Sequence, residues 1–144
     1  MDVSELRKRI LRALDDARKD ATERRAAMDQ ASAAYTTFLE SIAKPLMQQA
    51  ATVLRGEGQR FSVNTPASSV RLVSDGSPET YIELELDRSG DRPTVIGRAS
   101  AGRGAGSRII AEEPIGDGKA IAALTEDDVA RFILATVPKL VIKN

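Results

Sequence analysis

The feature that most constrains this chain is a helix-forming stretch at its N-terminus. Residues 2–55 contain no glycine, and glycine, proline and asparagine are all absent from Glu5 to Lys44, where alanine, leucine, arginine and glutamate favour a helix. Asp2 and Glu5 have the spacing of a capping box, in which Asp2 caps the first turn and Glu5 reaches back to the Asp2 N–H. The stretch therefore predicts one long helix, not a helical hairpin.

Pro45 is the first residue that conflicts with this helix. It has no N–H to donate, and its ring disfavours the helical conformation at Lys44. We expect the helix to break or kink near Pro45 and then to resume as far as Gly56, whose left-handed conformation would end it. In the resumed part we expect four apolar residues to be buried within the chain: Leu46, Met47, Ala50 and Val53.

Apolar residues along the first part recur at alternating steps of four and three, which is the heptad pattern of a coiled coil. The part before Pro45 would be roughly 60 Å long, whereas a compact chain of this length has a radius of gyration of only about 15 Å. The far half should therefore project from the folded domain, where its apolar seam needs a partner. The predicted partner interface consists of Ile10, Leu14, Ala17, Ala21, Met28, Ala31 and Tyr35.

The composition of the seam favours a homodimer. Ala17, Ala21 and Ala31 are small enough to let two helices approach closely, so we expect the helices to pair near their middles and to run antiparallel. The alternative partner is a helix of a different protein.

From Phe61 the apolar residues alternate with polar ones, which predicts β-strands. Strands are expected at residues 61–65, 70–73, 81–87, 94–100 and 107–111, joined by short turns into an antiparallel meander of about five strands. In the third strand, Ile82, Leu84 and Leu86 should face the core, and Glu83, Glu85 and Asp87 should face solvent.

The last predicted element is a C-terminal helix capped by Thr125, with Asp128 at the third position. Its apolar face should pack on the sheet. The predicted fold class is thus α+β: a long, coiled-coil-like N-terminal helix kinked near Pro45, an antiparallel meander and a C-terminal helix. Residues 1–56 form the helix or stalk, and residues 60–144 form a small domain that is one compact unit with residues 38–56.

The segment from Gly97 to Arg108 is rich in glycine and arginine and contains no acidic residue. Glycine lets backbone N–H groups approach an anion closely, and arginine binds phosphate oxygens with two hydrogen bonds. The segment lacks the glycine spacing of known nucleotide-binding loops, so a mobile hairpin tip kept soluble by arginine is the favoured interpretation, with anion binding as the alternative. The candidate anion ligands are Arg98, Arg103, Arg108, Gly102, Gly104 and Gly106.

Composition argues against several classes of function. The chain has no cysteine and no histidine, which removes thiol nucleophiles, imidazole bases and most transition-metal sites, so we expect no catalytic residues, metal or cofactor. The 21 basic and 21 acidic side chains cancel, so no global field attracts nucleic acid or an anionic membrane. Arg7, Lys8 and Arg9 interrupt the apolar residues near the N-terminus, so neither a signal peptide nor a membrane span is expected, and we predict a cytoplasmic protein.

The sequence therefore favours a non-enzymatic assembly or adaptor module that self-associates, or docks a partner protein, through its long helix. A phosphate- or nucleic-acid-binding module that uses residues 97–108 is the second hypothesis. The third is an enzyme whose site is completed by a partner chain.

Overall fold

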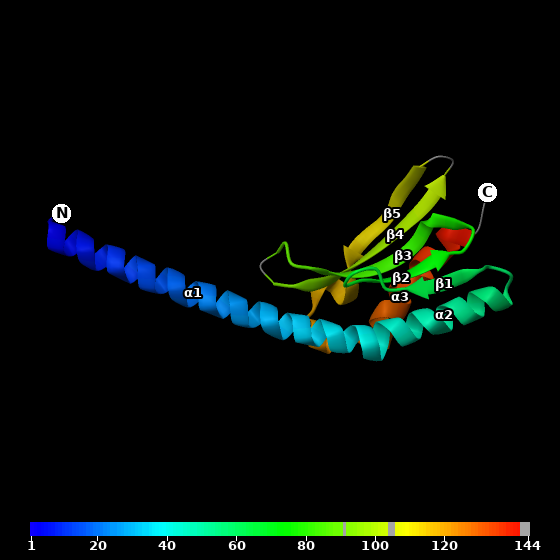
Figure 1. Cartoon of the computed structure of the whole chain (residues 1–144), viewed down its shortest axis with the longest axis horizontal. Coiled ribbons are helices and arrows are strands. Elements are labelled where there is room, and N and C mark those ends of the chain that lie inside the picture. Colours follow the sequence, from blue (N-terminus) through cyan, green and yellow to red (C-terminus); the bar gives the residue numbers. More distant parts are fainter. Residues whose placement is uncertain (91, 104–105, 142–144) are drawn as a thin grey trace.

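The computed structural model describes residues 1–90, 92–103 and 106–141. It has the predicted α+β class, with a long helical segment at the N-terminus, a five-stranded antiparallel sheet and a helix at the C-terminus (Figure 1).

The N-terminal segment is helical from Val3 to Gly56. It consists of α1 (Val3–Phe38), a π-helical turn η1 (Leu39–Ala43) and α2 (Lys44–Gly56). The Asp2 side chain caps α1 by accepting a hydrogen bond of 2.8 Å from the Glu5 N–H. The Glu5 carboxylate accepts a 2.9 Å hydrogen bond from Arg9 instead of reaching back to Asp2.

The π-helical turn lies immediately before Pro45, where the sequence predicts a break. A proline in a helix removes one hydrogen bond, and its ring crowds the carbonyl four residues earlier, which a wider π-type turn relieves. The helix therefore changes its winding and continues, and a kink at Pro45 stays a prediction. It ends at Gly56, but the left-handed residue after it is Gly58, with φ of 82°.

The sheet is a simple meander in which neighbouring strands are consecutive in sequence and antiparallel. Its strands are β1 (Phe61–Asn64), β2 (Val70–Ser74), β3 (Ser77–Asp87), β4 (Thr94–Arg103) and β5 (Gly106–Pro114). The last two are longer than predicted, so most of the glycine- and arginine-rich segment is strand.

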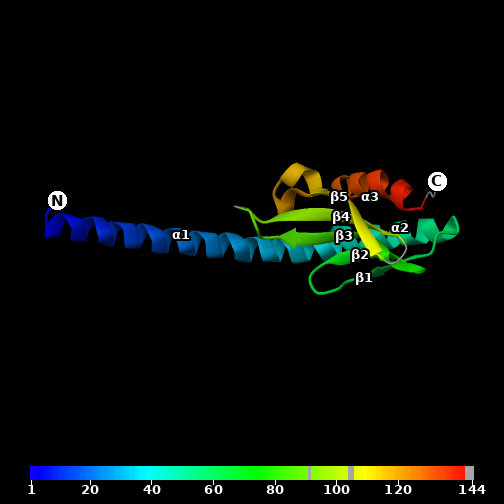
Figure 2. The same cartoon turned by 90° about the horizontal axis from the view of Figure 1, so that it is seen from above.

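Two helices cover one face of this sheet. α2 contacts β1 and β2, while α3 (Glu126–Val141) contacts β3 and β4 (Figures 1 and 2). Short 3-10 helices, η2 (Ile115–Gly118) and η3 (Ile121–Ala123), lead from β5 to α3. The buried core contains Phe38, Met47, Phe61, Val70, Leu72, Ile82, Leu84, Val95, Ala99, Ile115, Val129, Phe132 and Ile133.

The burial of α2 differs in part from the prediction. Met47 is fully buried and Leu46 and Ala50 are partly buried, but Val53 is 66% exposed. Ala51 is buried instead. A π-helical turn holds more residues than an α-helical turn, so it rotates every later residue relative to the 3.6-residue pattern read from the sequence.

The start of α3 has the predicted cap. The Thr125 N–H donates to Asp128 at 2.9 Å, and the Asp128 N–H donates back to the Thr125 hydroxyl at 3.3 Å. Lys119 donates a 2.8 Å hydrogen bond to the same carboxylate and, with the Thr125 N–H, lowers the pKa of Asp128. The helix continues through Pro138 to Val141.

The N-terminal half of α1 projects away from the rest of the molecule in both views (Figures 1 and 2). Within residues 1–27 no side chain is buried, and Tyr35 is the first fully buried residue of the helix. At 1.5 Å per residue, the projecting part is roughly 35 to 40 Å long.

Removal of residues 1–25 should leave the sheet and its two covering helices folded, because those residues contribute nothing to the core. Circular dichroism should show a cooperative thermal transition in the truncated chain, with helical signal reduced in proportion to the missing residues. Loss of cooperative unfolding would mean that the projecting helix is needed for the domain to fold.

Candidate interaction surface

Five large apolar side chains lie exposed near the N-terminal end of α1. Four of them follow each other at helical spacing, so they share one side of the helix, and the fifth adjoins it. We call this set the N-terminal stripe: Val3 (83% exposed), Leu6 (48%), Ile10 (49%), Leu11 (51%) and Leu14 (45%). Arg7 lies among the stripe residues and lines a shallow depression with four of them.

The predicted interface residues fall into two groups in the structure. Ile10, Leu14 and Ala17 are exposed on the projecting part. Ala21 is partly exposed, and Met28 and Ala31 lie where the helix approaches the domain; Ala31 packs against the core. The projecting part, without Tyr35, is therefore the surface that a partner could reach.

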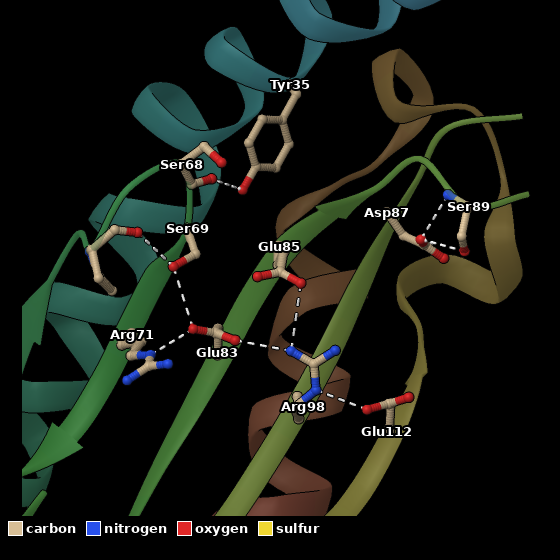
Figure 3. Close-up of polar contacts among 11 residues, drawn as sticks. Tyr35, Ser68, Ser69, Arg71, Glu83, Glu85, Asp87, Ser89, Arg98 and Glu112 are labelled. Carbon is tan, nitrogen blue, oxygen red and sulfur yellow. Dashed lines mark hydrogen bonds and ion pairs between the residues drawn. The ribbon is translucent and has the colours of Figure 1, made fainter.

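Tyr35 itself belongs to the core of the same chain. Its side chain is 4% exposed, its ring stacks on Phe38 with centroids 6.4 Å apart, and its hydroxyl donates to the Ser68 carbonyl (Figure 3). Burial raises the pKa of Tyr35 to about 12, so this hydroxyl stays protonated at neutral pH. Tyr35 thus fixes α1 to the start of β2 and is not available to a partner.

A second apolar surface was not predicted from the sequence. α2 and α3 leave a groove between them that is open to solvent and almost entirely apolar. Its lining residues are Leu46, Gln49, Ala50, Val53, Leu54, Ala130, Ile133, Leu134 and Val137. Two large apolar side chains, Val53 and Leu134, are exposed at this groove, Leu134 to 72%. In the sequence, only the apolar faces of α2 and α3 could have indicated this second apolar surface.

The glycine- and arginine-rich segment is not an open loop. Arg98, Gly102 and Arg103 lie in β4, and Gly106 and Arg108 lie in β5, while Gly104 is outside the described residues. The structure describes the backbone of Arg103 but not its side chain. Arg108 is exposed on β5, and a side chain on Gly106 would meet open space.

Two glycines of this segment are required by packing. A Cβ on Gly97 would lie 2.6 Å from Ile115 Cδ1 and 2.8 Å from Phe132 Cε2, and one on Gly102 would lie 2.6 Å from Ser77 Oγ. The Gly102 N–H also donates a 3.0 Å hydrogen bond to Thr80 Oγ1. Close packing of the sheet explains these two glycines without any bound anion.

Arg98 forms part of an ion-pair ladder that crosses four strands on the face of the sheet away from α3 (Figure 3). In the register of the sheet, Arg71, Glu83, Arg98 and Glu112 stand opposite one another on β2, β3, β4 and β5. Glu83 accepts from Arg71 at 2.5 Å and from Arg98 at 2.9 Å, and Arg98 also donates to Glu112 at 2.7 Å. The hydrogen bond to Glu112, together with the nearby charges of Glu85 and Glu83, raises the pKa of Arg98.

The expectation that Glu83 faces solvent is wrong. Glu83 is only 3% exposed, because arginines from both neighbouring strands and Ser69, at 3.3 Å, surround its carboxylate. Arg71 in turn lies 4.2 Å from the centre of the Tyr81 ring. Glu85 and Asp87, on the same face, are partly exposed, and hydrogen bonds from Ser89 lower the pKa of Asp87.

On this face of the sheet, Arg98 is already paired with carboxylates. The Arg98 guanidinium is already engaged by Glu83 and Glu112, with Glu85 3.6 Å away, so binding a phosphate there would require breaking these pairs. Among the described residues no group of three potential metal ligands occurs, and no helix is both long and apolar enough to cross a membrane. Because Arg98 is already paired, the exposed apolar surfaces of the helices are a stronger candidate for function than the glycine- and arginine-rich segment.

Comparison of the chain with protein-family models, with characterised proteins and with solved structures gives no match.

Substitution of Gly97 by alanine should lower the free energy of unfolding by about 1 to 3 kcal/mol, because the added methyl group would overpack Ile115 and Phe132. Gly106→Ala is the matched control and should change it by less than about 0.5 kcal/mol. Denaturant unfolding measures both. Equal stabilities for the two variants would contradict the packing role of Gly97.

Substitution of Arg98 by alanine should lower the free energy of unfolding by about 1.5 to 3 kcal/mol, because the buried Glu83 carboxylate loses one of its two guanidinium partners. The cost should be smaller in a Glu83→Gln background, since a neutral amide needs no counter-charge. Arg108→Ala serves as the exposed control. A penalty that is the same in both backgrounds would show that Glu83 is not the reason for it.

Proposed function

We propose that this protein is a non-enzymatic assembly module of the cytoplasm that self-associates through the projecting part of α1. The observation that carries the proposal is the N-terminal stripe: five large apolar side chains, each at least 45% exposed, on a helix that extends beyond its own domain. Burying each of them fully would contribute roughly 1.5 to 3 kcal/mol, so association has a clear driving force.

The shape of the molecule supports a partner contact at this place. In proteins most of the stability of a helix comes from packing its apolar face on another element and not from the helix propensity of its residues. The part of α1 from Val3 to Arg25 has good helix formers and a cap, but within residues 1–25 no side chain is buried. A partner would provide the missing tertiary packing.

The second hypothesis, a phosphate- or nucleic-acid-binding module, has weaker support. Its central residue, Arg98, is bound to carboxylates, and Gly97 and Gly102 are needed for packing. We therefore propose assembly and not anion binding as the activity of this chain.

Light scattering coupled to size exclusion tests self-association directly. The unmodified chain at micromolar concentration should have a mass of about 31 kDa, twice the 15.5 kDa of one chain, and Leu14→Asp should reduce it to that of the monomer because it buries a charge in the contact. Ala26→Asp is the matched control: Ala26 is exposed and lies about 160° round the helix from Ile10 at 100° per residue, so this variant should remain dimeric.

A monomer for the unmodified chain over the whole concentration range would refute self-association. The helix of a different protein would then be the occupant of the stripe.

A further inference from the structure

The groove between α2 and α3 and the N-terminal stripe are two apolar surfaces that the described residues leave open to solvent. The groove has a volume of about 300 Å³, and Val53 and Leu134 stand at it with 66% and 72% of their surface exposed. The stripe is convex and belongs to a single helix. One chain therefore carries both a helix with an unpartnered apolar side and a concave apolar seat between two helices.

We propose that the α2/α3 groove binds the N-terminal stripe of a second copy of this chain. The inference deepens the proposed function, on which it rests, by naming the surface that receives the projecting helix. It differs from a simple coiled coil, in which the two stripes would pack on each other and the grooves would stay empty.

The occupant must come from another molecule. α1, η1 and α2 form one continuous helical segment, so the stripe and the groove lie toward opposite ends of the same rod. A helix cannot fold back on itself without a break, and no turn occurs between Val3 and Gly56. The stripe of one chain therefore cannot reach the groove of the same chain.

The two surfaces are compatible in residue spacing and in length. An amphipathic helix that binds in a groove uses residues spaced three and four apart, and Val3, Leu6, Ile10 and Leu14 have this spacing. The groove is bounded by about two turns of each helix, from Leu46 to Leu54 in α2 and from Ala130 to Val137 in α3. This length matches the stripe to within a turn.

An antiparallel pair of the long helices satisfies both contacts at once. In such a pair the numbers of residues at the same level have a constant sum, so Leu14 level with Leu46 also puts Leu6 level with Leu54. The stripe and the groove of each chain then lie at about equal distances from a two-fold axis level with Gln30. Each chain places its stripe beside the α2 of the other, and the two contacts are identical.

Substitution in the groove separates this arrangement from stripe-to-stripe pairing. Leu134→Asp should convert the dimer to a monomer in light scattering, as Leu14→Asp does. Because Leu134 is exposed, the domain should stay folded, which circular dichroism would check. Ala135→Asp, on an exposed residue of α3 outside the groove lining, should leave the dimer intact. A Leu134→Asp variant that dimerises like the unmodified chain would overturn the inference and leave self-association standing.

Mixing the two defective variants gives an independent readout. A Leu14→Asp chain keeps an intact groove and a Leu134→Asp chain keeps an intact stripe, so one of the two contacts can form between them. The mixture should contain heterodimer that neither variant forms as a homodimer. The heterodimer keeps one of the two contacts, so it should form more weakly than the unmodified dimer. A mixture that stays monomeric up to the highest soluble concentration would overturn the inference.

Because the natural chain has no cysteine, single cysteines can be introduced without background. A mixture of Ile10→Cys and Leu134→Cys chains treated with a short bis-maleimide should yield the mixed cross-linked dimer. Ala26→Cys mixed with Leu134→Cys is the control and should yield little. Preferential linkage of Ile10→Cys to itself would identify stripe-to-stripe pairing and refute the groove as the seat, whereas no linked species and no dimer of the unmodified chain would refute the proposed function as well.

Discussion

The structure depends on the continuity of one helix. Backbone hydrogen bonding from Val3 to Gly56 makes a rod that the five-stranded sheet is too short to cover, so the sheet and α3 use only the part from about Ala31 onward. Everything on the N-terminal side is left to solvent or to a partner. The same continuity prevents the rod from folding back, which is why its exposed apolar side chains cannot be satisfied within the chain.

The π-helical turn decides which side of the rod faces the domain. Tyr35 and Phe38 before the turn, and Met47 and Ala51 after it, are all buried, although an unbroken 3.6-residue pattern would not bring all four to the same side. The change in winding accommodates Pro45 and keeps the packing face of α2 toward the sheet. It also turns Val53 outward, toward the groove with α3, so the accommodation of one proline creates an apolar surface.

Features that depend on local chemistry could be predicted from the sequence. The long helix, its Asp2 cap, the five strands and the Thr125 cap follow from residue types within a few positions of each other. Features that depend on distant residues could not. Burial of Glu83 requires arginines on both neighbouring strands in register, and exposure of Val53 requires the phase shift of the π-helical turn, neither of which an alternating or heptad pattern contains. For the same reason the sequence could not divide the predicted interface residues into buried and exposed ones. Only tertiary packing assigns Tyr35 to the core and leaves Ile10 outside it.

The distribution of charge and apolar surface also bears on whether self-association would stop at a dimer. Ion pairs on the open face of the sheet satisfy Arg71, Glu83, Arg98 and Glu112 among themselves, so these four charges are not free to recruit another chain. Most of the large apolar side chains that the described residues expose lie on the helices, with Ile109 on β5 as an exception. When a surface on one copy binds a different surface on the next copy, the assembly either closes by symmetry or grows without limit. Here the two surfaces lie at opposite ends of one rod and at equal distances from its middle, so two antiparallel copies would satisfy both contacts at the same time and leave no free end for a third.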